Sequence, residues 1–450
     1  MIPTPDATIC GNSAVWRPRE NTAAIRSTAA PKRGYITFVS EQHAGFGALG
    51  RLRSTTGRGE PQGTLVRGDN LPALERLAAS SPGLFRLVYL DPPYNSGRAF
   101  EEYDDRRSAF SWAEMMRPRL AALLPLLRDD GSVFIEIDDN ELGTLLTLGD
   151  EVFGRDNRIT VITVVRSAAT GHKAQNASPV NVADFLVGYA KKRSAFTYYP
   201  QVRVRASYDD AYNVWLDNPR AEPSAWTFCA LPEAFARAKD AATAAQLRKQ
   251  MGRAAFQADL AQFALAHCEH VVRYAQPRLE AIGIRARELA IRSKAEPGHV
   301  FVLEREGRPP FIVRGGNRIL FLRDKVRGEG KQRVLVEPLT NVWSDVPFQG
   351  IAREGGVTFR RNKKPEALLE RVIAMTTSPG DWVLDPFVGS GTTAAAAHKM
   401  GRPWVGIDEG EHLLSLAVPR LTRVIAGEDA TGISKRHDFR GGGGFRVYEA

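Results

Sequence analysis

Cysteine is scarce in this chain, whose 450 residues include only Cys10, Cys229 and Cys268. Three thiols this far apart exclude a disulfide framework and the paired-cysteine ligand sets of structural zinc sites. The run 267–270 reads His-Cys-Glu-His, but on a helix its cysteine would not share a face with both histidines. We therefore expect no metal site.

Long apolar runs are also missing. No stretch approaches the roughly 18 apolar residues that a membrane-spanning helix needs, and the first residues contain no signal-peptide core. These absences predict a cytoplasmic protein without a membrane partner. The chain is 43% hydrophobic and 25% charged, and it is long enough for a large core and a second module. Its net charge of +10 makes a polyanion a reasonable partner.

Short apolar strands alternate with amphipathic helices in two separate parts of the chain, which predicts a doubly wound α/β sheet. The strands are expected at 64–66, 85–90, 132–137, 159–165, 183–190, 381–385 and 404–408. The helices are expected at 71–79, 112–127, 140–153, 365–375, 392–399 and 411–425. Pro118 and Pro125 should kink the second helix, and Asp69 suits the N-cap of the first.

The alternation stops between about 195 and 340. A long helical stretch from Leu231 to about Ser293 precedes three expected hairpin strands at 300–304, 311–313 and 318–323, with glycine-rich turns between them. This block predicts an inserted α+β module. Its many arginines fit either a nucleic-acid surface or an ordinary solvated surface.

These patterns divide the chain into five segments. Residues 1–60 form a basic extension in which only 35–39 have the composition of a strand; contact with DNA phosphates and a lack of fixed structure fit this segment equally well. The two halves of the main sheet are 61–195 and 341–427, and the insert is 196–340. The tail, 428–450, has a glycine run at 441–444 and one expected strand.

The sequence Asp91-Pro92-Pro93-Tyr94 directly follows the expected strand 85–90, at the end where open α/β sheets place their chemistry. Two prolines fix φ and remove two N–H groups, which leaves a rigid corner with a carboxylate, a carbonyl and an aromatic ring. The two acceptors suit the two hydrogens of an exocyclic amino group on a nucleobase. Tyr94 can stack on that base once it is flipped out of a duplex. A plain surface turn is the alternative interpretation.

A second motif, Asp385–Thr392, combines the end of a strand, a glycine turn and the start of a helix. Gly389 and Gly391 let a ligand lie against the backbone, and the helix that begins at Thr392 offers free N–H groups to a carboxylate. Asp408, at the end of the next strand, can bind ribose hydroxyls. The spacing differs from the Gly-x-Gly-x-x-Gly of dinucleotide-binding proteins, so S-adenosylmethionine fits better.

The two motifs in this order resemble the β group of amino DNA methyltransferases, and most of all the modification subunits of type III restriction-modification systems. The resemblance covers roughly 64–195 and 340–450, and its other matching stretches are Arg67–Asn70, Ile137–Glu141, Phe153-Gly154, Gly188–Lys191, Val342–Asp345 and Lys363–Glu366. It implies a Rossmann-like S-adenosylmethionine-dependent methyltransferase sheet, with circularly permuted motif order and an inserted α+β target-recognition module. The chain departs from the pattern at Asp184, where family members commonly carry His-Glu, and it is shorter than expected of such subunits.

The resemblance also implies roles for individual residues. The catalytic residues would be Asp91, Pro92, Pro93 and Tyr94. The cofactor-binding residues would be Asp69 at the adenine, Lys364 and Pro365 beside the methionine, Asp385, Phe387, Gly389, Ser390, Gly391 and Thr392 in the loop, and Asp408, or its neighbour Glu409, on the ribose.

The activity implied by the resemblance is methyl transfer from S-adenosylmethionine to adenine N6 in double-stranded DNA, without a metal. In the family that the chain resembles, an aspartate as the first residue of the Asp91–Tyr94 motif favours adenine N6 over cytosine N4. A purine also offers a larger ring surface for stacking on Tyr94 and Phe100. The alternatives are cytosine-N4 methylation, a non-catalytic DNA-binding subunit, and an RNA or small-molecule methyltransferase. The implied setting is a restriction-modification or related defence system, and the protein partners it allows are a restriction subunit and a second copy of the chain. The middle module is expected to choose the DNA sequence.

Overall fold

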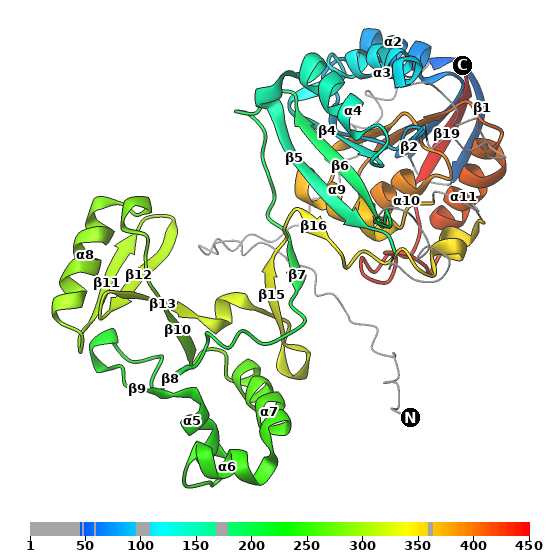
Figure 1. Ribbon diagram of the computed structural model, residues 1–450. Helices are drawn as coiled ribbons and strands as arrows, with labels where there is room; N and C mark the ends of the chain where they lie inside the picture. The colour runs from blue at the N-terminus through cyan, green and yellow to red at the C-terminus, as the bar shows by residue number, and fades with distance from the viewer. Residues whose placement is uncertain (1–45, 47–48, 58–59, 96–108, 168–178, 359–362) are drawn as a thin grey trace, which may run out of the picture. The chain divides into compact units, whose positions relative to one another are not determined.

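The computed structural model describes residue 46 and residues 49–57, 60–95, 109–167, 179–358 and 363–450 (Figure 1). The strand expected at 35–39, the arginines before residue 45 and Phe100 lie outside these residues. The described chain forms two compact units. Unit 1 takes in the residues up to Gln201 and those from Thr340 onward, and unit 2 is Val202–Leu339. No helix among the described residues is long and apolar enough to cross a membrane.

Unit 1 is built on one ten-stranded sheet. In spatial order its strands are β1 (Arg51–Gly57), β19 (Gly444–Glu449), β2 (Gly63–Arg67), β18 (Trp404–Asp408), β17 (Trp382–Asp385), β3 (Phe85–Leu90), β4 (Leu127–Ile137), β6 (Ala183–Ala190), β5 (Arg158–Val165) and β16 (Val342–Trp343). The six strands from β19 to β4 are parallel, whereas β1 and β6 run antiparallel to their neighbours. The two parts of the chain that alternate in sequence therefore contribute to a single sheet.

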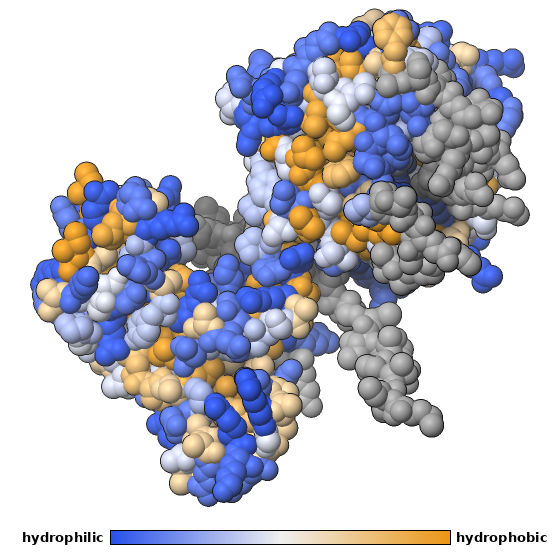
Figure 2. Space-filling view, in the orientation of Figure 1, coloured by the Kyte–Doolittle hydropathy of each residue, from blue (hydrophilic) through white to orange (hydrophobic). Residues whose placement is uncertain are grey.

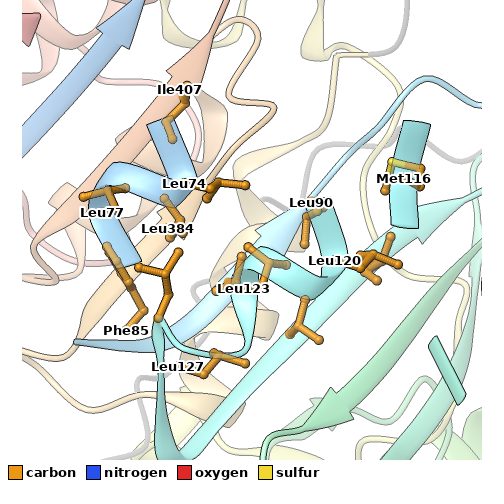
Figure 3. Packing of buried hydrophobic residues seen from close by; sticks show 14 of the residues in the cluster. Leu74, Leu77, Phe85, Leu90, Met116, Leu120, Leu123, Leu127, Leu384 and Ile407 are labelled. Atoms are coloured by element: carbon orange, nitrogen blue, oxygen red, sulfur yellow. The ribbon is translucent and has the colours of Figure 1, made fainter. Parts of the chain in front are cut away.

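Helices cover both faces of this sheet (Figure 1). One layer is α2 (Asn70–Ser80), α3 (Ala109–Leu123) and α4 (Leu142–Gly149), and the other is α9 (Glu366–Thr376), α10 (Thr392–Lys399) and α11 (Val418–Ala426). Figure 3 shows how the first layer is packed: apolar side chains of α2 and α3, spaced three or four residues apart, meet the sheet residues Phe85, Leu90, Leu384 and Ile407. Truncating one of these buried leucines to alanine should destabilise unit 1 by about 2–5 kcal/mol.

The opposite face of the sheet matters for the site. Successive residues of a strand point to opposite faces, so Val88 and Leu90 lie in the core under α2 and α3, whereas Tyr89 points to the other face. By the same alternation Glu136 of β4 and Asp184 of β6 share the face of Tyr89. That is the face on which α9 packs, since α9 lies against β3 and β4.

The predicted doubly wound α/β fold is confirmed for unit 1, and every strand expected among its described residues is present. Two details were wrong. The helix expected over 112–127 ends at Leu123, because Pro125 disfavours helical geometry at the residue before it, and β4 begins at Leu127. A strand also forms at Arg51–Gly57, inside the segment expected to have one only at 35–39. Its side chains are exposed on both faces, so no apolar alternation marked it.

Unit 2 contains a six-stranded antiparallel sheet, a three-stranded sheet and four α-helices among its described residues. The larger sheet has the order β11 (Val300–Arg305), β12 (Arg308–Arg314), β13 (Asn317–Phe321), β10 (Val271–Ala275), β8 (Val214–Leu216) and β9 (Phe228–Ala230). The smaller sheet is β14 (Val326–Arg327), β15 (Val334–Pro338) and β7 (Val202–Val204). The helices are α5 (Leu231–Ala238), α6 (Ala244–Met251), α7 (Arg253–Ala266) and α8 (Ile284–Ala295).

The three expected hairpin strands of unit 2 are present, with turns at Gly307 and at Gly315-Gly316. The continuous helical stretch expected from Leu231 to Ser293 was wrong, because β10 interrupts it. Three of the five residues of β10, Val271, Val272 and Tyr274, are β-branched or aromatic, and β10 pairs with β13 and β8. On the face of unit 2 drawn in Figure 2, hydrophilic side chains are interspersed with apolar ones; exposed apolar residues of this unit include Ile284 and Ile291 of α8.

Candidate active site

The two sequence motifs meet at one edge of the ten-stranded sheet. Strands β3 and β17 are parallel neighbours, with Leu384 opposite Val88, so the segments that follow them leave the sheet side by side. A pocket lies where they meet. It is lined by Tyr89, Asp91, Lys364, Leu369, Asp385, Phe387, Val388, Gly389, Ser390, Thr392 and Thr393.

The corner after β3 is held by contacts from neighbouring elements. The indole N–H of Trp112, a fully buried residue of α3, donates to the Pro93 carbonyl over 2.7 Å. Asn95 takes a left-handed backbone conformation with φ of 56°, and its side chain donates to Glu141 Oε1 over 2.6 Å. The Tyr94 ring is only 5% exposed. Stacking on a base would require this ring to be uncovered, so that role stays a prediction.

The glycine turn is fixed by Asp408. Gly389 and Gly391 have φ of 51° and 80°, which L side chains rarely adopt. The Gly389 N–H donates to Asp408 Oδ2 over 3.0 Å, while Asp408 Oδ1 accepts from the Gly410 N–H over 2.9 Å and lies 2.9 Å from Nε2 of His412. Asp408 therefore shapes the turn directly.

Asp385 closes the floor of the pocket. Its carboxylate accepts from the Phe387 N–H over 2.9 Å. Burial raises the pKa of Asp385 to about 7, although hydrogen bonds from Thr393 and Phe387 favour the ionised form. Such a carboxyl group can accept or release a proton near neutral pH.

Lys364, in the C-terminal half of the chain, contacts the corner that Asp91–Tyr94 form after β3. Its Nζ lies 2.6 Å from Asp91 Oδ1, 2.5 Å from the Tyr94 hydroxyl and 3.3 Å from Glu136 Oε1. Burial acts to lower the pKa of Lys364, but the carboxylates of Asp91 and Glu136 outweigh it and raise that pKa above its ordinary value. The ammonium is therefore charged, and it binds the Asp-Pro-Pro-Tyr corner directly.

Two further buried carboxyl groups lie behind Lys364, and the sequence reasoning missed both. Glu136 is fully buried and accepts a hydrogen bond from the Tyr89 hydroxyl. Asp184 is fully buried with Arg166 Nε at 3.0 Å. Burial raises the pKa of both groups, and that of Asp184 to about 8. The available signal was a lone acid within each of two apolar strands.

A second buried ionic cluster supports the glycine turn from below. Arg420 Nη1 donates to Thr392 Oγ1 over 2.7 Å, and its Nη2 lies 2.9 Å from Glu366 Oε1. Lys399 bridges Glu366 and Asp429, each at 2.7 Å. This cluster joins α9, α10 and α11 at the base of the pocket.

Comparison with known proteins then decides the family. The family described as DNA methylase matches residues 85–252 and 312–419, which is more than half of the chain. The chain belongs to the DNA methylase family. The matched ranges include both motifs that meet at the pocket, and the family resemblance predicted from those motifs is confirmed.

Individual relatives of this DNA methylase can be compared along the chain. The "Probable type III restriction-modification enzyme HindVI Mod subunit" of Haemophilus influenzae is 28% identical over 92% of this chain and 57% of its own length. The type II methyltransferase M.EcaI of Enterobacter cloacae is 25% identical over 77% of this chain and 66% of its own. The chain thus spans little more than half of the first relative. The solved M1.HpyAVI–SAM complex is 14% identical, with a TM-score of 0.37, and covers 80% of this chain and 98% of its own.

Not every residue predicted for the site lines the pocket of this DNA methylase. Asp69 caps α2 by accepting from the Leu71 N–H over 3.0 Å, and it pairs with Arg119 at 2.9 Å. Its neighbour Asn70, which the sequence reasoning missed, donates to the Pro386 carbonyl over 2.8 Å. Pro365 is the N-cap of α9. The cofactor roles of Asp69, Pro365 and Asp408 stay predictions, as do the roles of all the other residues assigned to the cofactor or to catalysis.

The sequence analysis expected no metal site, including at the His-Cys-Glu-His run 267–270 of unit 2. Among the described residues, no group of three or more His, Cys, Asp or Glu side chains is placed to hold a metal ion. His270 instead bonds the Leu216 carbonyl through Nδ1 at 2.8 Å and stacks on Trp215.

Proposed function

We propose that this chain transfers a methyl group from S-adenosylmethionine to adenine N6 in double-stranded DNA. The observation that carries the proposal is the shared pocket, in which the Asp91 corner and the glycine turn face each other across β3 and β17. Membership of the DNA methylase family supports the reaction class, and relatives named methyltransferases and Mod subunits support DNA as the substrate.

The pocket residues fit a sulfonium methyl donor. Gly389 leaves room for a ligand against the backbone, and the α10 N-terminus at Thr392 suits its carboxylate. Asp385 suits its ammonium group. When bound, the cofactor supplies an activated methyl group on a positively charged sulfur.

The chain itself positions the amine. The amine nitrogen would attack the methyl carbon: the N–C bond would form, the C–S bond would break with its electron pair going to sulfur, and the proton lost from the nitrogen would pass to solvent water. Asp91 and the Pro92 carbonyl accept the two amine hydrogens, which favours the tetrahedral nitrogen that attacks. Orientation and fixed acceptors provide the acceleration.

Adenine is favoured over cytosine because a carboxylate is the stronger acceptor and a purine offers the larger face for stacking, worth about 1–3 kcal/mol per base. Cytosine N4 is the second candidate, since its amine meets the same acceptors. Digestion of methylated DNA to nucleosides followed by mass spectrometry separates the two products.

The Mod-subunit relatives favour a role in a restriction-modification system, with a restriction subunit as partner. A second copy of the chain as partner stays a prediction. We assign sequence choice to unit 2, which carries no part of the pocket. Base-modification sequencing of host DNA with and without the gene should reveal one methylated sequence. Replacing 202–339 by the equivalent residues of a relative should change that sequence; an unchanged sequence with retained activity would place recognition in unit 1.

A further inference from the structure

The Asp91 corner makes an ionic contact that methyl transfer does not itself require. Lys364 Nζ lies 2.6 Å from Asp91 Oδ1 and 4.8 Å from the centre of the Tyr94 ring. Lys364 is 6% exposed, so this ammonium exchanges its hydration for protein partners. A buried charge persists only where its partners compensate for the lost water.

We propose that Lys364 is a positioning residue for methyl transfer, which holds the Asp91 carboxylate in its reactive orientation and is itself held by buried Glu136. The proposal rests on the proposed function and assigns roles that extend it. Because Lys364 binds Oδ1 of Asp91, we assign Oδ2 to the amine of the target base.

The surroundings of Asp91 explain why a cation is needed there. Its ionisable and charged neighbours come from the strands β3, β4, β6 and β17, from the corner after β3 and from the segment before α9: Tyr89, Tyr94, Glu136, Asp184, Asp385 and Lys364, with Arg166 beyond Asp184. Three of these are carboxyl groups. Without the ammonium, Asp91 would face like charges, which favour a protonated carboxyl and weaken it as an acceptor.

Glu136 and Asp184 take no part in the reaction itself, yet both are fully buried. Glu136 is 3.3 Å from Lys364 Nζ and is oriented by the Tyr89 hydroxyl. Burying such groups is unfavourable, so their presence on the same face as Lys364 points to a function. Glu136 helps to fix where the ammonium lies and offsets part of the positive charge that a cationic methyl donor meets.

The neighbouring Lys363 provides a matched control. It is 7% exposed, and its Nζ donates to the Val357 carbonyl over 2.7 Å and to the Glu354 carbonyl, away from the pocket. Lys363→Met therefore removes an equally buried ammonium without touching Asp91. It should lower thermal stability while keeping most of the turnover.

The test compares Lys364→Met, Lys363→Met and Glu136→Gln in the full chain. Lys364→Met should lose roughly 100-fold in kcat, the scale of a misplaced reactive group, with calorimetric binding of S-adenosylmethionine changed much less. The acid limb of its pH–rate profile should move to higher pH. Glu136→Gln should move that limb down, because it removes a like charge beside Asp91. Equal kcat losses in the two lysine variants, or an unmoved acid limb, would overturn the proposal.

A second readout works without methyl transfer. In protein labelled with ¹³C aspartate, the Asp91 carboxyl signal, assigned with Asp91→Asn, should respond to pH at a higher pH in Lys364→Met than in the parent chain. An unchanged response refutes the positioning role. A parent chain that methylates no DNA refutes the proposed function instead, and the ¹³C measurement still decides the role of Lys364.

Discussion

Asp408 offers the sharpest single perturbation of the cofactor pocket. Its two carboxylate oxygens accept from the Gly389 and Gly410 N–H groups over 3.0 and 2.9 Å, so Asp408→Ala removes the acceptors that shape the glycine turn. A hydrogen bond to a charged group contributes about 1.5–3 kcal/mol. If binding has to restore the Gly389 contact alone, affinity for S-adenosylmethionine should fall by about 10-fold to 150-fold.

Isothermal titration calorimetry measures this change directly, and circular dichroism checks that the variant is folded. Glu409→Ala is the control, because Glu409 is the exposed neighbour that was the alternative ribose ligand. Normal affinity in Asp408→Ala together with weak binding in Glu409→Ala would refute the reasoning and move the ribose role to Glu409.

Three further substitutions test the support around the pocket. Trp112→Phe removes the hydrogen-bond donor to the Pro93 carbonyl. It should lower the free energy of unfolding by about 1 kcal/mol and reduce kcat without changing cofactor affinity. An unchanged kcat would show that the Asp91–Tyr94 corner does not need this hydrogen bond. Arg420→Met leaves Glu366 buried without its guanidinium partner and should destabilise unit 1 by about 3–5 kcal/mol in denaturant unfolding; a loss under 1 kcal/mol would contradict this. Burial lowers the pKa of His398, so the folded state resists protonation that the unfolded state accepts below about pH 6.5. Stability should therefore fall as pH drops below that value, and His398→Phe should flatten the fall; parallel curves would refute it.

The sequence predicted the sheet well because buried parallel strands are short apolar runs with clear ends. The segments Phe85–Leu90 and Trp382–Asp385 are of this kind, and each is followed directly by its motif. The two motifs could therefore be placed at one edge of the sheet before any coordinates were known. The glycine turn could also be predicted from sequence, because Gly389 and Gly391 can adopt the positive φ angles that other residues rarely adopt.

The features that the sequence did not predict have one physical cause: each depends on contacts between residues that are far apart in the chain. Strand β1 has exposed side chains and exists through backbone pairing with β19, in which Arg51 lies opposite Glu449. The side chain of Arg53 also contacts Glu449, 396 positions further along the chain. Lys364 lines the pocket and its assignment to the cofactor stays a prediction, but its contact with Asp91, 273 positions away, does not follow from its motif. The buried acids Glu136 and Asp184 could not be assigned to the site from sequence, because only the fold brings them near the Lys364 ammonium.

The central claim is that Asp91 and the pocket beside it transfer a methyl group to adenine N6. The most direct measurement incubates the purified chain and its Asp91→Ala variant with double-stranded DNA and S-adenosylmethionine carrying a labelled methyl group, and then identifies the labelled nucleoside by mass spectrometry. We predict labelled N6-methyladenine from the parent chain and no product from the Asp91→Ala variant, which should still bind the cofactor. Near-normal turnover by Asp91→Ala, or label in N4-methylcytosine as the main product, would contradict it.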